Sequence, residues 1–263
     1  MNIRGFSVII GDGVVRLANG YLVDTTNEEL LEYTKGEGFI MENRIVDRPI
    51  REASEAHVAL SLVLDVSASM QGDSIKFLNI AVNEMIRQMK ADDHLRNIVD
   101  LAIFIFGTHG RQNILQGFRA IADCDDVNLI ANDVNTYVAD ALDHAIEITK
   151  RRCSVYDKAG GSYKPWIVLI TDGEFHDGAA ALGNIGNKMR ERESQGKLQF
   201  FGLGVNGYIR SQLEGLTTNP SHVIDAKSVN FIEFFSWIGK SLKAVSSKEI
   251  GENVSLPPLQ FTV

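Results

Sequence analysis

Three oxygen-bearing side chains, Asp65, Ser67 and Ser69, occupy alternate positions directly after a continuous apolar run in the stretch LSLVLDVSASM. A carboxylate and two hydroxyls at the end of a buried strand are costly unless something satisfies them. The protein itself, a catalytic partner or a metal ion could do so. The alternation predicts that the three side chains turn toward one point, while Val66 and Ala68 face away.

Two later stretches carry further oxygen donors. Thr136 lies in VNTYVADAL, where a helix is expected to begin, and Asp172 lies in LITDGEFHD, after another apolar run. In an open parallel sheet, ligands bind at the carboxyl ends of the strands, so we expect all three stretches to meet at that edge. Hard oxygen donors without imidazole or thiolate suit Mg²⁺ or Mn²⁺ and disfavour Zn²⁺ or copper. The sequence therefore predicts a metal site made of Asp65, Ser67, Ser69, Thr136 and Asp172.

Side chains beside these stretches are predicted to form a rim that contacts a partner protein. The predicted rim consists of Met70, His109, Tyr137, Phe175, His176 and Asp177. A solvent-facing loop role is the alternative for the aromatic and histidine residues, and Asp177 could be a solvated loop acid. Taken singly, Asp65 could also cap the following helix, and the two serines could be ordinary turn residues. The metal site is favoured because the three stretches occur together.

The elements that must position these residues alternate between strands and helices from about residue 57 onwards. Near-continuous apolar runs are typical of strands in a parallel sheet that is covered on both faces, and apolar residues at helical spacing separate them. This alternation predicts an α/β fold, in which a mostly parallel central sheet lies between helices. The expected strands are 57–66, 98–107, 112–118, 165–173, 198–205 and 221–226, and the expected helices are 73–90, 137–152, 178–195 and 230–246.

The two ends of the chain do not continue this pattern. Residues 1–52 are predicted to form a small N-terminal extension of short strands and loops, packed on the main domain because so short a fold is marginal alone. Within it, TNEELLEYTKGEG is expected to form a short helix. The main domain is predicted to span 53–248. The tail, 249–263, contains two prolines and is expected to be extended.

Composition narrows the classes of function. The chain has 263 residues and a net charge of −8, which disfavours nucleic acid and acidic membrane surfaces as partners. No apolar run reaches the roughly 18 residues of a transmembrane helix, and the N-terminus lacks the pattern of a secretory signal. The two cysteines have neither metal-ligand spacing nor a disulfide framework. Together these features favour the cytoplasm.

The three stretches, DVSAS with Met70, the Thr before a helix in NTYVADAL, and TDGEFHD, resemble the von Willebrand factor A family over residues 57 to 245. They match its metal-ion-dependent adhesion site, in which Asp-x-Ser-x-Ser is joined by a distant Thr and Asp. The resemblance implies a Rossmann-like fold in which Ser67 and Ser69 bind the metal directly. It implies that Thr136 binds directly or through water, that the aspartates often act through water, and that a partner's carboxylate completes the shell.

Two small residues depart from the family pattern, because Ala68 and Ala139 stand where glycine is common. We expect modest changes of loop geometry and retention of the site. The absent signal and the few cysteines make the chain more similar to intracellular bacterial members. Among these it is most similar to the tellurite-resistance-associated type, which works in stress or phage defence.

Three hypotheses follow for the function. The first is a non-enzymatic, metal-dependent module that binds a Glu or Asp of another protein, within a bacterial stress-response or defence complex. The second is a Mg²⁺-dependent hydrolase or phosphotransferase that uses the same acidic site; it is disfavoured because Ser67 replaces the second Asp of haloacid-dehalogenase-like phosphatases and no general base falls in the three stretches. The third is a scaffold that has kept the motif without binding metal. The sequence leaves the partner's identity and the oligomeric state open.

Overall fold

The protein divides into two units, Met1–Arg48 and Pro49–Val263. The structure, a computed structural model, describes residues 9–11, 14–16, 22–24, 47–107, 114–205 and 207–261. In the first unit, three short strands, β1 (Ile9–Gly11), β2 (Val14–Arg16) and β3 (Leu22–Asp24), form an antiparallel sheet in that order. Short strands were predicted here, and the helix expected in TNEELLEYTKGEG lies outside the described residues. How this unit packs on the rest stays a prediction.

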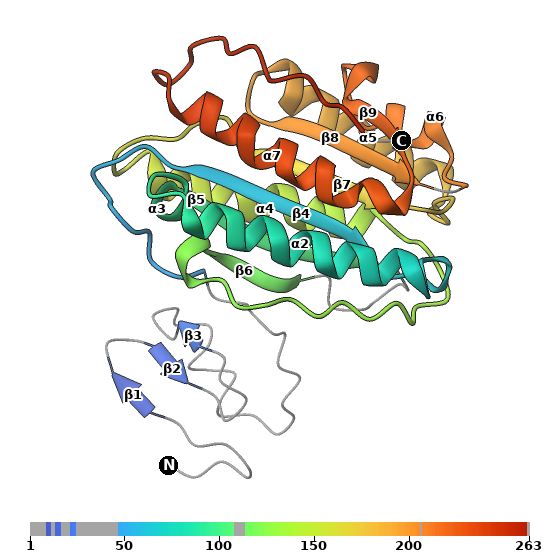
Figure 1. Cartoon of the computed structure of the whole chain (residues 1–263), viewed down its shortest axis with the longest axis horizontal. Coiled ribbons are helices and arrows are strands. Elements are labelled where there is room, and N and C mark those ends of the chain that lie inside the picture. The colour runs from blue at the N-terminus through green and yellow to red at the C-terminus, as the bar shows by residue number, and fades with distance from the viewer. Residues whose placement is uncertain are drawn as a thin grey trace. The chain divides into compact units, whose positions relative to one another are not determined.

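The second unit is built on a six-stranded sheet whose order is β6-β5-β4-β7-β8-β9 (Figure 1). Five of the strands run parallel, and β6 pairs antiparallel with β5 at one edge. The predicted α/β fold with a mostly parallel sheet between helices is therefore confirmed. Its strands are β4 (Val58–Asp65), β5 (Val99–Phe106), β6 (Ile114–Ala120), β7 (Trp166–Thr171), β8 (Gln199–Val205) and β9 (Val223–Ala226).

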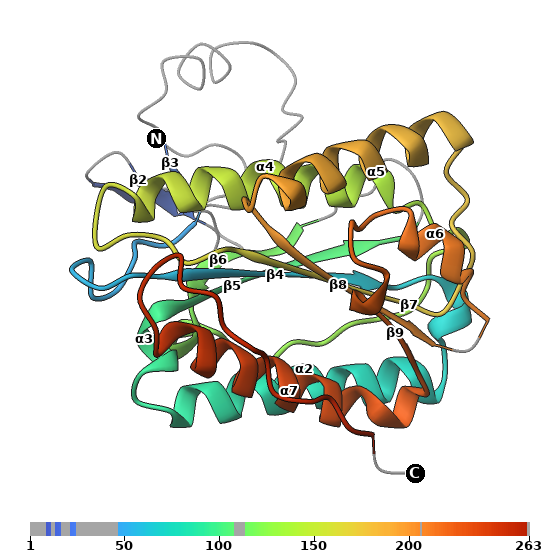
Figure 2. The same cartoon turned by 90° about the horizontal axis from the view of Figure 1, so that it is seen from above.

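Helices cover both faces of this sheet. Seen from above, α4 and α5 lie on one face, and α2 and α7 lie on the other (Figure 2). The α-helices are α2 (Asp73–Ala91), α3 (Leu95–Ile98), α4 (Ala139–Tyr156), α5 (Ala179–Ser194), α6 (Arg210–Glu214) and α7 (Phe231–Ser246), and the 3₁₀ turns are η1 (Ala68–Met70), η2 (Ile121–Asp123), η3 (Pro220–His222) and η4 (Ser228–Asn230). The short helices α3 and α6 were not predicted. None of the helices in the described part of the chain is long and apolar enough to cross a membrane.

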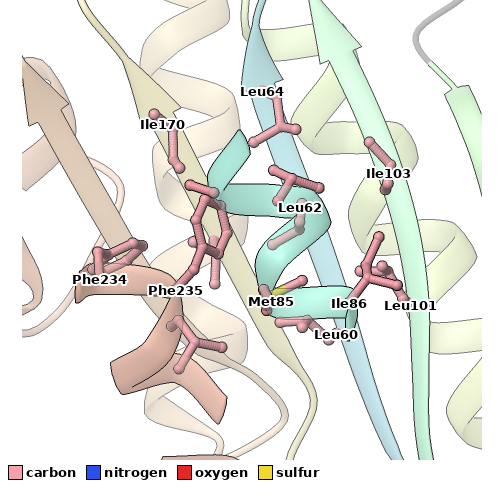
Figure 3. Packing of buried hydrophobic residues seen from close by; sticks show 14 of the residues in the cluster. Leu60, Leu62, Leu64, Met85, Ile86, Leu101, Ile103, Ile170, Phe234 and Phe235 are labelled. Atoms are coloured by element: carbon pink, nitrogen blue, oxygen red, sulfur yellow. The ribbon is translucent and has the colours of Figure 1, made fainter. Parts of the chain in front are cut away.

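The central strand β4 is buried over its whole length because each face meets a separate apolar cluster. On one face, Leu60, Leu62 and Leu64 point toward α2 and α7, where Met85 and Phe235 meet them (Figure 3). On the other face, alternate residues of β4 pack against α4, in a cluster to which α5 also contributes. Burial on both faces explains the near-continuous apolar sequence of this strand. It also fixes the register of β4 and so the place where its last residue, Asp65, emerges.

The segment after α7 has neither helix nor strand from Glu252 to Phe261, as expected for the tail. It nevertheless packs on the domain. Trp237 Nε1 donates to the carbonyl oxygen of Pro257 over 2.7 Å, and Leu259 contacts the apolar cluster beneath α2 and α7. The tail is therefore part of the second unit.

Candidate metal centre

The carboxylate of Asp65, the last residue of β4, is completely buried at the carboxyl edge of the sheet. Its Oδ1 accepts a hydrogen bond from Ser67 N over 2.8 Å, and its Oδ2 accepts one from Thr171 Oγ1 over 2.6 Å. Burial raises the pKa of Asp65 from 3.8 to about 6, although these hydrogen bonds act in the opposite direction. A buried carboxylate whose pKa stays raised in spite of these hydrogen bonds is an incompletely compensated charge.

The two serine hydroxyls and the second aspartate form a chain of hydrogen bonds. Ser67 Oγ lies 2.9 Å from Ser69 Oγ, and Ser69 Oγ donates to Asp172 Oδ1 over 2.6 Å. Asp172 follows β7, the strand next to β4, and is 6% exposed. Burial also raises the pKa of Asp172. Residues more than a hundred positions apart thus meet at one point, as the sequence predicts.

The convergence of the serines does not arise from an extended strand. Ser67 has φ −65° and ψ 164°, and the chain then turns through η1 before Gly72, whose φ of +81° lies in the region that favours glycine. Because of this turn, Ser69 is exposed while Met70 turns inward. The side chains of Asp65, Ser67 and Ser69 nevertheless converge, as the sequence predicts.

Thr136 reaches the same point from the loop before α4. A Cβ added to Gly173 would lie 3.5 Å from Thr136 Oγ1 and 3.6 Å from Ser69 Oγ. The loop is tied to the first stretch through Asp133, whose carbonyl oxygen accepts a hydrogen bond from Ala68 N over 2.6 Å. Five predicted ligand residues are therefore brought together by neighbouring strands and one loop.

Several predicted rim residues lie elsewhere than expected. Met70 is 0% exposed and belongs to the apolar core, and Phe175 is 4% exposed and contacts Phe106 edge to face. Neither side chain is at the surface, so the prediction that they form a partner-contacting rim needs correction. The physical reason is that each of these large apolar side chains is buried in an apolar cluster of the domain.

The other rim residues differ among themselves. His176 is exposed, its ring meets that of half-buried Tyr137 edge to face, and its Nδ1 accepts a hydrogen bond from Thr136 N. Asp177 is 8% exposed, and its carboxylate accepts hydrogen bonds from two backbone N–H groups at the start of α4. It is thus a buried helix cap and not a solvated acid. His109 lies outside the described residues.

Two residues that the sequence did not single out, Thr171 and Asp133, take part in the site. Thr171 holds Asp65, and Asp133 joins two loops through its backbone. The threonine directly before Asp172 could have been noticed, whereas no local pattern marks a backbone bridge. Val134 is 82% exposed next to Asp133, which makes it an apolar group open to a partner.

The residues present fit a hard divalent cation. Their donors are two carboxylates and three hydroxyls, and nowhere in the described ranges do three or more His, Cys, Asp or Glu side chains gather as a metal site. Such an all-oxygen set suits Mg²⁺ or Mn²⁺. The missing side chain of Gly173 leaves open the space next to the hydroxyls of Thr136 and Ser69. The buried negative charge of Asp65 would be stabilised by a cation bound beside it.

Comparison with known proteins places the chain in a family. A sequence model of the von Willebrand factor type A domain matches residues 60–236, and none of the curated protein sequences is a match. Among solved structures, the pilus adhesin SpaC from Lactobacillus rhamnosus GG is similar with a TM-score of 0.57 and 14% identity, over 73% of this chain and 31% of that one. A von Willebrand factor type A protein from Catenulispora acidiphila has a TM-score of 0.51 and 15% identity, over 72% and 43%.

A third similar structure is proximal thread matrix protein 1 from the mussel byssus, which is described with zinc in its metal-ion-dependent adhesion site (MIDAS) motif. Its TM-score is 0.44 and its identity 17%, over 71% of this chain and 48% of that one. The chain spans less than half the length of the first solved structures that it matches. At such identities, the two likenesses with TM-scores above 0.5 establish the fold.

Proposed function

The chain belongs to the von Willebrand factor type A family, whose domains commonly mediate protein–protein interactions, and on this premise we propose that it is a metal-dependent protein-binding module. Its binding point is the carboxyl edge of the sheet, where the donors of β4, β7 and the loop before α4 meet. The proposed ligand is a Glu or Asp side chain of another protein.

Asp65, Ser67, Ser69, Thr136 and Asp172 would hold Mg²⁺ or Mn²⁺, and the ion would supply a positive charge for an incoming carboxylate. Asp65 and Asp172 together carry two negative charges, so they balance a divalent ion without adding a third. Ser69 is the exposed member, and it presents its hydroxyl where a partner can approach. Val134, also exposed, adds apolar contact area beside this point.

The observation that carries this proposal is the hydrogen-bonded chain from Ser67 to Ser69 to Asp172 beside the buried carboxylate of Asp65. Ser69 Oγ donates to Asp172 Oδ1, and burial raises the pKa of Asp65. A bound cation would take the place of the hydrogen bond between Ser69 and Asp172, and it would neutralise the buried charge of Asp65. Both features are those of a ligand set preformed for a positive charge.

Hydrolysis is not part of the proposal. The three stretches contain no Lys, their one histidine, His176, uses its Nδ1 to accept from Thr136 N, and Ser67 stands where a second catalytic Asp would be needed. We infer that the protein is not an enzyme. Assays of phosphatase activity with Mg²⁺ test this inference, and turnover that is lost in Asp65→Asn would contradict it.

The cellular setting is also a proposal. Both cysteines are free thiols, Cys124 buried and Cys153 half-buried, which agrees with a reducing compartment such as the cytoplasm. The similarity to the tellurite-resistance-associated type supports a role within a bacterial stress-response or defence complex. A tellurite or phage challenge of the host with and without this protein tests that role.

The decisive experiment measures metal binding and partner capture with matched variants. Calorimetry with Mg²⁺, Mn²⁺ and Zn²⁺ should show binding of the first two to the wild type and at least tenfold weaker binding to Ser69→Ala. Ser194→Ala, which removes an exposed hydroxyl from the end of α5, is the control and should bind normally. Proteins captured from host extract in Mg²⁺ should be lost with chelator and with Ser69→Ala. If the same proteins are captured in chelator and by Ser69→Ala, the proposal is wrong.

A further inference from the structure

Four consecutive backbone N–H groups at the loop before α4 all donate to acceptors outside their own segment. Two consecutive residues of the loop after β7, His176 and Asp177, provide three of these acceptors. The bonds run from Thr136 N to His176 Nδ1 (3.0 Å), from Tyr137 N to Gly107 O (2.7 Å), from Val138 N to Asp177 Oδ2 (2.7 Å) and from Ala139 N to Asp177 Oδ1 (3.1 Å). The loop carrying Thr136 is thus gripped by the loop that carries Asp172.

We propose that His176 and Asp177 form a clamp of positioning residues that holds Thr136 in register with Asp172. Neither side chain is a ligand in this scheme; each acts through the backbone of the Thr136 loop. The inference rests on the proposed function only in taking Thr136 as a ligand residue. The hydrogen bonds of the clamp use none of the five proposed ligand side chains.

His176 forms hydrogen bonds with both the backbone N–H and the backbone carbonyl of Thr136. The ring Nδ1 accepts from Thr136 N, and the backbone N of His176 donates to Thr136 O over 3.0 Å. The first bond requires that Nδ1 carries no hydrogen, which assigns it as the acceptor of the ring. Two reciprocal bonds to one residue fix its position and the direction of its backbone. Because threonine is branched at Cβ and stiff at χ1, a fixed backbone also restricts where Oγ1 can point.

Asp177 connects the same loop to the start of α4. Its carboxylate is buried and bonds to the first N–H groups of α4, which are the groups that a helix leaves without internal partners. The negative charge also lies at the positive end of the helix dipole. As a result, the start of α4 and the loop after β7 are held together as one piece.

The consequence for the site is a division into two halves. Thr136 and Asp172 belong to one half, joined by the clamp, while Ser67 and Ser69 belong to the other. The halves meet through the hydrogen bond from Ser69 to Asp172 and the backbone bridge at Asp133. Loosening the clamp should therefore displace Thr136 without disturbing the serines.

The test compares His176→Ala, His176→Asn and the control His144→Ala in the full chain. Asn Oδ1 lies at the same branch position as His Nδ1 and accepts a hydrogen bond, so it should restore the clamp. His144 is exposed on α4 and serves as a matched histidine loss. The first measurement is hydrogen exchange of residues 136–139 in metal-free protein, and the second is Mg²⁺ affinity by calorimetry.

We expect His176→Ala to speed exchange at Thr136 about tenfold and to weaken Mg²⁺ binding about tenfold, as for other losses of groups that support metal ligands. His176→Asn should return both within about twofold of wild type, and His144→Ala should change neither. Unchanged exchange in His176→Ala would overturn the clamp. Faster exchange with unchanged Mg²⁺ affinity would overturn its positioning role. If the wild type binds no metal, the proposed function fails. The exchange rate at Thr136 in His176→Ala still tests the clamp in that case, because faster exchange supports it and unchanged exchange contradicts it.

Discussion

Replacement of Asp65 by asparagine is expected to stabilise the metal-free protein and to abolish its stabilisation by metal. The side chain is completely buried, and its pKa is raised from 3.8 to about 6. A difference of about two in pKa corresponds to about 3 kcal/mol of unfavourable free energy for the charged form at pH 7.5. A neutral amide of the same shape removes this cost.

The amide also changes two hydrogen bonds. One oxygen can still accept from Ser67 N, while the new NH₂ group faces Thr171 Oγ1, which can rotate and accept instead. A partly lost hydrogen bond costs about 1 kcal/mol. The expected net gain in the free energy of unfolding is therefore about 2 kcal/mol, or about 4–8 °C in melting temperature for a domain of this size.

Urea denaturation in chelator measures this gain. Trp166 and Trp237, the only two tryptophans of the chain, are both buried in the second unit, so their fluorescence reports its unfolding. Adding Mg²⁺ to a hundred times its dissociation constant should stabilise the wild type by about 2.7 kcal/mol and leave Asp65→Asn unchanged. The order of the two stabilities should then reverse.

The dependence on pH has a definite sign. Because folded Asp65 keeps its proton up to about pH 6 and the unfolded chain only to about 3.8, its contribution to stability is present below 3.8 and is lost as the pH rises through this window. Asp65→Asn should lack this fall. A variant that is less stable than wild type in chelator would refute the argument from burial, and equal stabilisation of both proteins by Mg²⁺ would refute the assignment of Asp65 to the metal.

Three further substitutions separate the site from its supports. Asp177→Ala removes the cap of α4 and should lower the free energy of unfolding by about 1–2 kcal/mol in urea titrations, with no gain of stability in any buffer. Gly107→Ala would place a Cβ 2.4 Å from the Cβ of Asp133, so calorimetry should show weaker Mg²⁺ binding together with a loss of about 1–3 kcal/mol in stability. Asp100→Asn leaves Arg152 buried without its charge partner and should cost about 3–5 kcal/mol, while the protein that remains folded binds Mg²⁺ normally, since this pair lies away from the carboxyl edge.

The sequence predicts the sheet well because its strands carry a strong physical signal. Burial on both faces requires an apolar residue at nearly every position of β4, and β5 shows nearly the same pattern. The stripe of Leu78, Val82 and Met89 on α2 is equally direct, because helical periodicity and burial coincide there. The edge strand β6 is half covered, so its sequence shows neither its pairing partner nor its antiparallel direction.

The loops could be predicted only in part. Oxygen donors at the ends of strands indicate a site, but the direction of each side chain depends on the turn that follows. Met70 is buried because η1 replaces the extended chain, and Asp177 is buried because α4 begins beside it. These outcomes depend on contacts between distant segments, which leave no periodic mark on the sequence.

The buried charge of Asp65 destabilises the folded state, whereas the hydrogen bonds of the loops around it stabilise their own conformation. This contrast bears on function. A fold selected only for stability would have no use for a buried carboxylate whose pKa is raised to about 6. The surrounding loops nevertheless hold it in place with Thr171, and they hold Thr136 with His176 and Asp177. Rigid support around an unfavourable charge is expected where a ligand supplies the missing compensation, because preorganised donors lose little entropy when that ligand binds. The same arrangement in a purely structural loop would raise the free energy of the folded state without any return, which is why the stability of Asp65→Asn in chelator separates the two interpretations.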